Sequence, residues 1–102
     1  MVHKIILDPT ANLDITESID WYNKAQPGVG LKFYKQVQAV MKSIRKNPFA
    51  FRVRYNTSRT ATLKNFPFLL HYIIDSERKV IVVTSVLHTS RDPKLWDGRK
   101  KF

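Results

Sequence analysis

The sequence contains no cysteine and only three glycines, and it carries eight acidic side chains against eighteen basic ones. Without cysteine, neither a disulfide framework nor a thiolate metal site can form. The histidines, His3, His71 and His88, lack the spacing that is typical of metal ligands. We therefore expect no metal and no cofactor.

Long apolar runs and Gly/Ser-rich or repetitive segments are also missing. No stretch approaches the roughly 20 apolar residues that a helix needs to cross a bilayer. The apolar run near the N-terminus is much shorter than the apolar region of a signal peptide. These features predict a cytoplasmic protein with no membrane partner. The chain length predicts one domain over residues 1–102, with residues 97–102 as a candidate disordered tail.

The positive charge is unevenly distributed along the chain. Residues 1–30 contain two basic and four acidic side chains, whereas residues 31–102 contain sixteen basic and four acidic ones. Such polarity suits a polyanionic partner, either a nucleic acid or an acidic protein segment. The alternative is that the surplus of lysine and arginine only keeps the protein in solution.

The strongest β signal lies in the second half of the chain. Residues 80–88, VIVVTSVLH, form a β-branched run typical of a central strand covered on both faces. Residues 67–74 predict a second strand, joined to the first by a polar turn and therefore antiparallel to it. Alternation over residues 59–64 predicts a third strand with one polar face. Residues 52–55 are a candidate for a short extra strand.

Two amphipathic helices are predicted upstream of these strands. The first begins at Asp8, Pro9 or Thr10 and ends at the segment 27–30. We expect Ala11, Ile15, Ile19 and Tyr22 to face the core, and Asp14, Glu17 and Asp20 to keep the outer face polar. The second helix covers residues 31–46, and its predicted inward positions are Phe33, Tyr34, Val37, Val40, Met41 and Ile44. We expect Trp21 and Trp96 to be packing residues.

The predicted fold class is α+β. An N-terminal strand over residues 2–7 precedes an antiparallel helical hairpin, and a three-stranded antiparallel meander follows, with both helices packed on one face of the sheet. Besides this order of elements, the chain contains a series of short motifs. The motifs are Asp14-Ile15, Trp21-Tyr22, Phe33, Val37, Asn47-Pro48, Phe51, Lys64, Phe66-Pro67-Phe68, the segment from His88 to Pro93, and Trp96.

In order and spacing, this combination resembles the RelE/ParE family of toxins from type II toxin–antitoxin modules. The resemblance implies a growth-inhibiting toxin of the plasmid stabilisation type that an acidic cognate antitoxin neutralises. One branch of the family cleaves mRNA in the ribosomal A site, and the other inhibits DNA gyrase without hydrolysing a substrate. An inactive relative that only binds antitoxin or nucleic acid is a third alternative.

Metal-free RNA cleavage by a 2′-hydroxyl needs a base, an acid and cations for the charge on the phosphate. His88 is the candidate acid or base, because its ordinary pKa lies near neutrality, and Arg91 is the catalytic candidate next to it. The alternative role for His88 is to hold the following loop by hydrogen bonds. His71, in the middle of a predicted strand, is interpreted as structural. The candidate residues for binding nucleic acid or the target are Arg52, Arg54, Arg59 and Lys64.

The sequence differs from the nuclease branch after His88, where Thr89 replaces the tyrosine expected from the resemblance. No tyrosine follows Tyr72, and no carboxylate near the predicted sheet is a convincing base. These differences favour the non-nucleolytic, ParE-like mode over an mRNA endonuclease. If the basic face carries toxicity, replacing Arg59 and Lys64 by alanine should relieve growth arrest without unfolding the protein.

Overall fold

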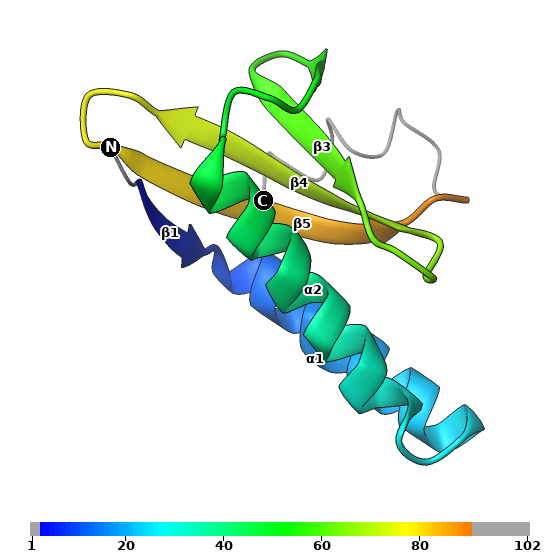
Figure 1. Ribbon diagram of the computed structural model, residues 1–102. Helices are drawn as coiled ribbons and strands as arrows, with labels where there is room; N and C mark the ends of the chain where they lie inside the picture. Colours follow the sequence, from blue (N-terminus) through cyan, green and yellow to red (C-terminus); the bar gives the residue numbers. More distant parts are fainter. Residues whose placement is uncertain (1–2, 91–102) are drawn as a thin grey trace.

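The computed structural model describes residues 3–90, which form two helices and a five-stranded mixed sheet (Figure 1). The predicted α+β class is confirmed. The elements are β1 (Lys4–Leu7), α1 (Pro9–Ala25), α2 (Val29–Lys46), β2 (Val53–Tyr55), β3 (Ser58–Thr62), β4 (Phe68–Asp75) and β5 (Val80–His88). The strand order is β1-β5-β4-β3-β2, so β5 is an interior strand.

The sheet consists of an antiparallel meander and one parallel edge strand. β1 pairs with β5 in parallel, with Lys4 opposite Val80, while β2, β3, β4 and β5 pair antiparallel in sequence order. The candidate extra strand at residues 52–55 is therefore present as β2. It extends the predicted three-stranded meander by one short strand, and the predicted tail at 97–102 lies outside the described residues.

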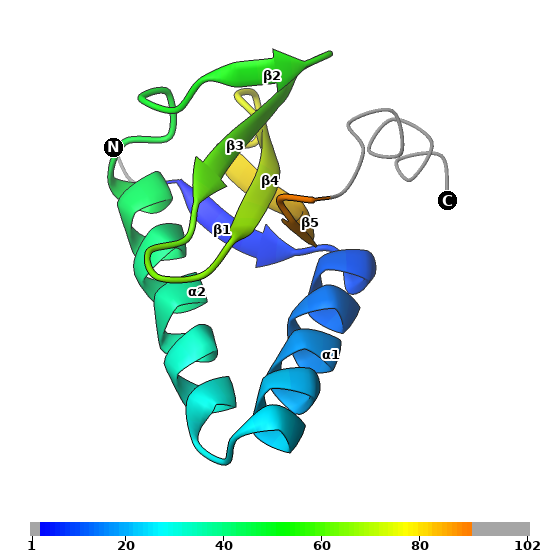
Figure 2. The same cartoon turned by 90° about the vertical axis from the view of Figure 1, so that its right-hand side faces the viewer.

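The helical hairpin starts and turns at residues suited to those places. Asp8 is the N-cap of α1, where its side chain accepts a hydrogen bond from the Thr10 backbone N–H at 3.1 Å, and Pro9 occupies the first turn. Gly28 precedes α2 with a φ of 93°, a conformation that side chains disfavour. The Asn23 side chain accepts from the Gly30 N–H at 2.9 Å. Figure 2 shows the two helices converging at this turn.

Gly30 lies where the two helices come closest to each other. A β-carbon at this position would lie 2.6 Å from the Asn23 side chain and 2.6 Å from the Ile19 carbonyl oxygen. We therefore predict that Gly30→Ala lowers the free energy of unfolding by about 2 kcal/mol, because the backbone must move to relieve the overlap. Chemical denaturation followed by circular dichroism measures this, and an unchanged midpoint would contradict the close approach.

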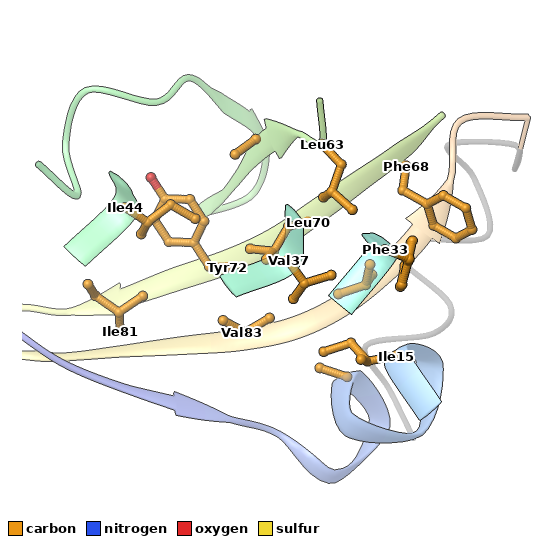
Figure 3. Close-up of a cluster of buried hydrophobic side chains, with 13 residues drawn as sticks. Ile15, Phe33, Val37, Ile44, Leu63, Phe68, Leu70, Tyr72, Ile81 and Val83 are labelled. Carbon is orange, nitrogen blue, oxygen red and sulfur yellow. The ribbon is translucent and has the colours of Figure 1, made fainter. Parts of the chain in front are cut away.

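The main core lies between the helices and one face of the sheet. In Figure 3, Phe33, Val37 and Ile44 from α2 lie over the side chains of β4 and β5. The buried apolar side chains of this core are Ala11, Ile15, Phe33, Val37, Ile44, Ala61, Leu63, Phe68, Leu70, Tyr72, Ile81, Val83 and Val86. The predicted inward stripes are therefore confirmed except at Tyr34, which is 41% exposed.

Asp14 occupies a different position from the one predicted. It lies on the inner side of α1, is 9% exposed, and its Oδ2 accepts a hydrogen bond from the Val86 backbone N–H at 2.9 Å. The prediction of an outward carboxylate was wrong because position 14 is three residues after the buried Ala11 and next to Ile15. Helical geometry places those positions on one face. The carboxylate thus joins α1 to the end of β5.

Tyr72 secures the segment after α2 to the sheet. Its buried hydroxyl donates a 2.7 Å hydrogen bond to the Pro48 carbonyl. Burial raises the pKa of the Tyr72 phenol to about 12, an effect that the positive charge of Arg59 partly opposes. The folded protein therefore holds this proton more tightly than the unfolded chain, whose phenol has a pKa of about 10.

From this pKa difference we predict that Tyr72 makes stability fall at alkaline pH. Above about pH 10 the unfolded chain loses the phenol proton while the folded chain keeps it, so the free energy of unfolding decreases as pH rises towards 12. Tyr72→Phe should cost about 1.5 kcal/mol at neutral pH and less at pH 11. Urea denaturation at both values tests this, with the exposed Tyr34→Phe as control. A mutant with the wild-type pH dependence would contradict it.

Candidate partner-binding pocket and basic surface

A pocket opens between α1 and the last residues of β5. Its volume is about 430 Å³. The residues that line it are Asp14, Glu17, Ser18, Trp21, Tyr22, Phe68, Val86, Leu87 and His88. Helix periodicity brings the first five to one side of α1, and strand pairing places Phe68 opposite His88. The pocket is therefore built by elements far apart in the sequence.

Aromatic rings form a continuous wall from the pocket into the core. The Tyr22 ring lies 5.5 Å from Phe33 and 5.1 Å from Phe66, and burial raises the pKa of the Tyr22 hydroxyl. Phe68 contacts the His88 ring edge-on at 5.2 Å. Trp21 contacts Tyr22 at 5.0 Å but remains 65% exposed. The predicted packing role of Trp21 is thus wrong, since one neighbouring ring covers only part of it.

His88 is exposed and forms hydrogen bonds to the turn that follows it. Its Nδ1 accepts from the Ser90 backbone N–H at 3.1 Å and lies 2.8 Å from the Ser90 hydroxyl oxygen. Because a backbone N–H can only donate, Nδ1 carries no proton in this arrangement and the neutral ring holds its proton on Nε2. This geometry is that of a histidine holding the following loop.

The other predicted histidine lies inside the protein. His71 is fully buried in β4, and its Nδ1 lies 3.2 Å from the Tyr55 hydroxyl. It is paired across the sheet with Thr60 and Ser85, which are also buried. These neighbours agree with the structural role expected for His71.

The predicted binding residues lie away from the pocket. Arg54 lies on β2 and Arg52 lies directly before it, and both are exposed. Lys64 is exposed in the turn before β4, at the same end of the sheet as His88. None of them lines the pocket, whose wall contains no lysine or arginine among residues 3–90. Arg91 and Trp96 lie outside the described residues.

Arg59 points towards the connection between α2 and β2. Its Nη1 donates to the Phe51 carbonyl at 2.5 Å and to the Phe49 carbonyl at 3.3 Å, and the guanidinium lies 5.3 Å from the centre of the Phe49 ring. The guanidinium thus holds two carbonyls of one loop. Its hydrogen-bonding role is structural in this arrangement.

Sequence reasoning missed the two carboxylates that line the pocket. Asp14 and Glu17 lie on α1, far along the chain from His88, but the packing of α1 on β5 brings all three to one pocket. The spacing of Asp14 from Ala11 would have indicated the inner face of the helix. Nothing in the sequence indicated that α1 reaches the end of β5.

Residues 3–90 contain neither a metal-binding cluster nor a membrane-spanning helix. Within residues 3–90, no cluster of three or more histidine, aspartate or glutamate side chains could hold a metal ion. In the same range, neither helix is long and apolar enough to cross a membrane.

The architecture is that of toxins from toxin–antitoxin modules. A chain of the chromosomal ParDE system from P. aeruginosa superimposes with a TM-score of 0.74 and 21% identity, covering 85% of this chain and 96% of that one. Isolated E. coli RelE gives a TM-score of 0.62 and 17% identity, with 97% of each chain covered. A RelBE2 complex from Mycobacterium tuberculosis gives 0.58 and 17%, covering 86% and 99%.

The sequence itself assigns the family. Residues 5–93 match the family described as the ParE toxin of the type II toxin-antitoxin system, parDE. Because the match covers most of the chain, the protein belongs to the ParE toxin family. The predicted RelE/ParE resemblance is thereby confirmed, as is the class of type II toxin. No curated protein matches the chain significantly.

Proposed function

We propose that this toxin inhibits growth by binding a macromolecular target, DNA gyrase in the first instance, and that it does not cleave RNA. The observation that carries the proposal is the composition of the pocket at His88. Two carboxylates from α1 line it, and no described lysine or arginine does. The match of the chain to the ParE family is a second observation that supports the proposal.

Electrostatics make this pocket unsuitable for phosphate chemistry. A scissile phosphate gains negative charge on the way to its transition state, and cations or hydrogen-bond donors must stabilise that charge. Carboxylates at Asp14 and Glu17 would instead repel it. His88 is also engaged through Nδ1 with Ser90, which removes that nitrogen as the base. Among residues 3–90, no lysine or arginine lines the pocket beside His88 to supply that stabilisation.

The proposed function gives the toxin two partners, an acidic cognate antitoxin and the macromolecular target. The surplus of positive charge over residues 31–102 suits an acidic, partly disordered antitoxin that folds as it binds. Arg52, Arg54 and Lys64, all exposed, supply part of this basic surface. We place this interaction in the cytoplasm and assign the module a role in plasmid stabilisation.

The alternative function is that of a ribosome-dependent mRNA endonuclease. His88 would serve as the acid or base, Arg91 as its catalytic partner, and Arg52, Arg54, Arg59 and Lys64 would bind the RNA. The exposure of His88 at the end of β5 is the observation that favours it. An inactive relative that binds only antitoxin or nucleic acid is the third possibility.

Two assays on the purified full-length toxin separate these functions. The first is gyrase-catalysed DNA supercoiling, and the second is reconstituted translation with the mRNA 5′ ends mapped by primer extension. We expect inhibited supercoiling and intact mRNA. New ribosome-dependent ends that disappear in His88→Ala would instead support the endonuclease. Failure of the toxin in both assays, with no growth arrest on expression, would support the inactive relative.

A further inference from the structure

Glu17 differs from the other carboxylates of α1. The Asp14 carboxylate accepts from Val86, and that of Asp20 forms an ion pair with Lys24 at 3.0 Å. Glu17 is exposed at the rim of the pocket, and no described residue forms an ion pair with it. In a protein with a formal charge of +10, an unpaired carboxylate beside a cavity is available to an outside cation.

Large apolar side chains lie on both sides of Glu17 along the same helix face. Leu13 is 57% exposed and Trp21 is 65% exposed, and each lies four residues from Glu17. Phe68 and Leu87 continue the apolar wall inside the pocket. Exposed tryptophan and leucine side chains beside a concave site are typical of surfaces that bind a partner.

These features together match the chemistry of one side chain. An arginine guanidinium forms paired hydrogen bonds with a carboxylate and stacks on tryptophan, while its methylene groups pack on apolar walls. Nucleic acid does not fit, because its phosphates would approach Glu17 and Asp14. The carboxylates that line the pocket are thus complementary to a basic protein segment.

We propose that the pocket binds an arginine side chain presented by the protein target, with Glu17 pairing the guanidinium and Trp21 stacking on it. The proposal rests on the proposed function, because it names what the toxin recognises on that target. It assigns the target to the acidic pocket and leaves the exposed basic residues Arg52, Arg54 and Lys64 to the antitoxin.

Binding is tested on the full-length toxin with N-acetyl-arginine methylamide as the probe. In a 15N–1H NMR titration we expect saturable shifts confined to amides near Glu17, Trp21 and His88. The neutral citrulline analogue should give none, and Glu17→Gln should lower the affinity at least tenfold. Asp20→Asn is the matched control, because Asp20 lies on the same helix outside the pocket. Equal shifts with citrulline, or full binding by Glu17→Gln, would overturn the proposal.

Growth arrest in a bacterial host tests whether the occupant belongs to the target. We expect Glu17→Gln and Trp21→Ala to lose arrest while Asp20→Asn retains it, with thermal melts showing that all three variants fold. Arrest retained by both pocket variants would overturn the assignment to the target. If sedimentation showed that the wild-type toxin dimerises and that Glu17→Gln does not, a second copy would be the occupant and the assignment would also be overturned. Failure of the wild type to arrest growth would overturn the proposed function, whereas the NMR titration would still decide whether the pocket binds arginine.

Discussion

Asp14→Ala is expected to lower the free energy of unfolding by about 3 kcal/mol. The carboxylate lies at the interface of α1 and β5 and accepts the Val86 N–H at 2.9 Å. Alanine leaves that buried N–H without its acceptor and leaves a small cavity as well, so two costs add. Urea denaturation followed by circular dichroism measures the loss.

The same substitution should disturb the end of β5. Val86 lies two residues before His88, so we expect the His88 and Ser90 amide resonances to shift or broaden in the Asp14→Ala spectrum. Asp14→Asn keeps an oxygen acceptor and should cost only about 1 kcal/mol. Asp20→Ala, which removes an exposed ion pair, should change stability by less than about 0.5 kcal/mol. Equal losses for Asp14→Ala and Asp20→Ala would show that the buried hydrogen bond contributes little.

The fold was predictable because its local signals agree with its global arrangement. The β-branched run at residues 80–88 indicates an interior strand, and β5 is one. Periodicity locates both helices, and Asp8 caps the first. Helical periodicity predicts which side of a helix faces the core only to within about one residue position. This is why the predicted inward position of Tyr34 was wrong. That residue lies at the edge of the inward stripe of α2, where its neighbour Phe33 takes the buried place.

The candidate site was less predictable because it depends on contacts between distant segments. Sequence spacing could have placed Asp14 on the inner face of α1, and Glu17 is exposed as expected. It could not show that α1 packs against the end of β5, so His88 was considered without these two carboxylates. Trp21 was assigned to packing because large aromatics in small domains mostly are buried. Its exposure follows from the position of α1 at the border of the core, a tertiary property with no local signal.

The hydrogen-bond partners of Arg59 could not be predicted from the sequence either. Its residue type suits phosphate binding, and it stays a candidate for target binding, but the choice of hydrogen-bond partners is a property of the folded loop. Phe49 and Phe51 present their carbonyls to Nη1, and both lie in the segment that joins α2 to β2. Arg59 therefore helps to secure this connection, which the Tyr72 hydroxyl also holds through the Pro48 carbonyl.

We predict that Arg59→Ala lowers the free energy of unfolding by about 2.5 kcal/mol, since it removes two charge-assisted hydrogen bonds and a cation–π contact. Lys64→Ala, in an exposed turn, should change stability by less than about 0.5 kcal/mol. Thermal and urea denaturation of both variants measure the difference.

These stabilities decide how a growth assay on the basic face must be read. Relief of arrest by the Arg59 and Lys64 double mutant would be explained by loss of folded toxin, because Arg59 alone accounts for most of the destabilisation. Lys64→Ala, or Arg54→Ala on β2, tests the basic face without that complication. If Arg59→Ala proved as stable as wild type and still relieved arrest, the contacts with Phe49 and Phe51 would be incidental and Arg59 would belong to the target-binding surface.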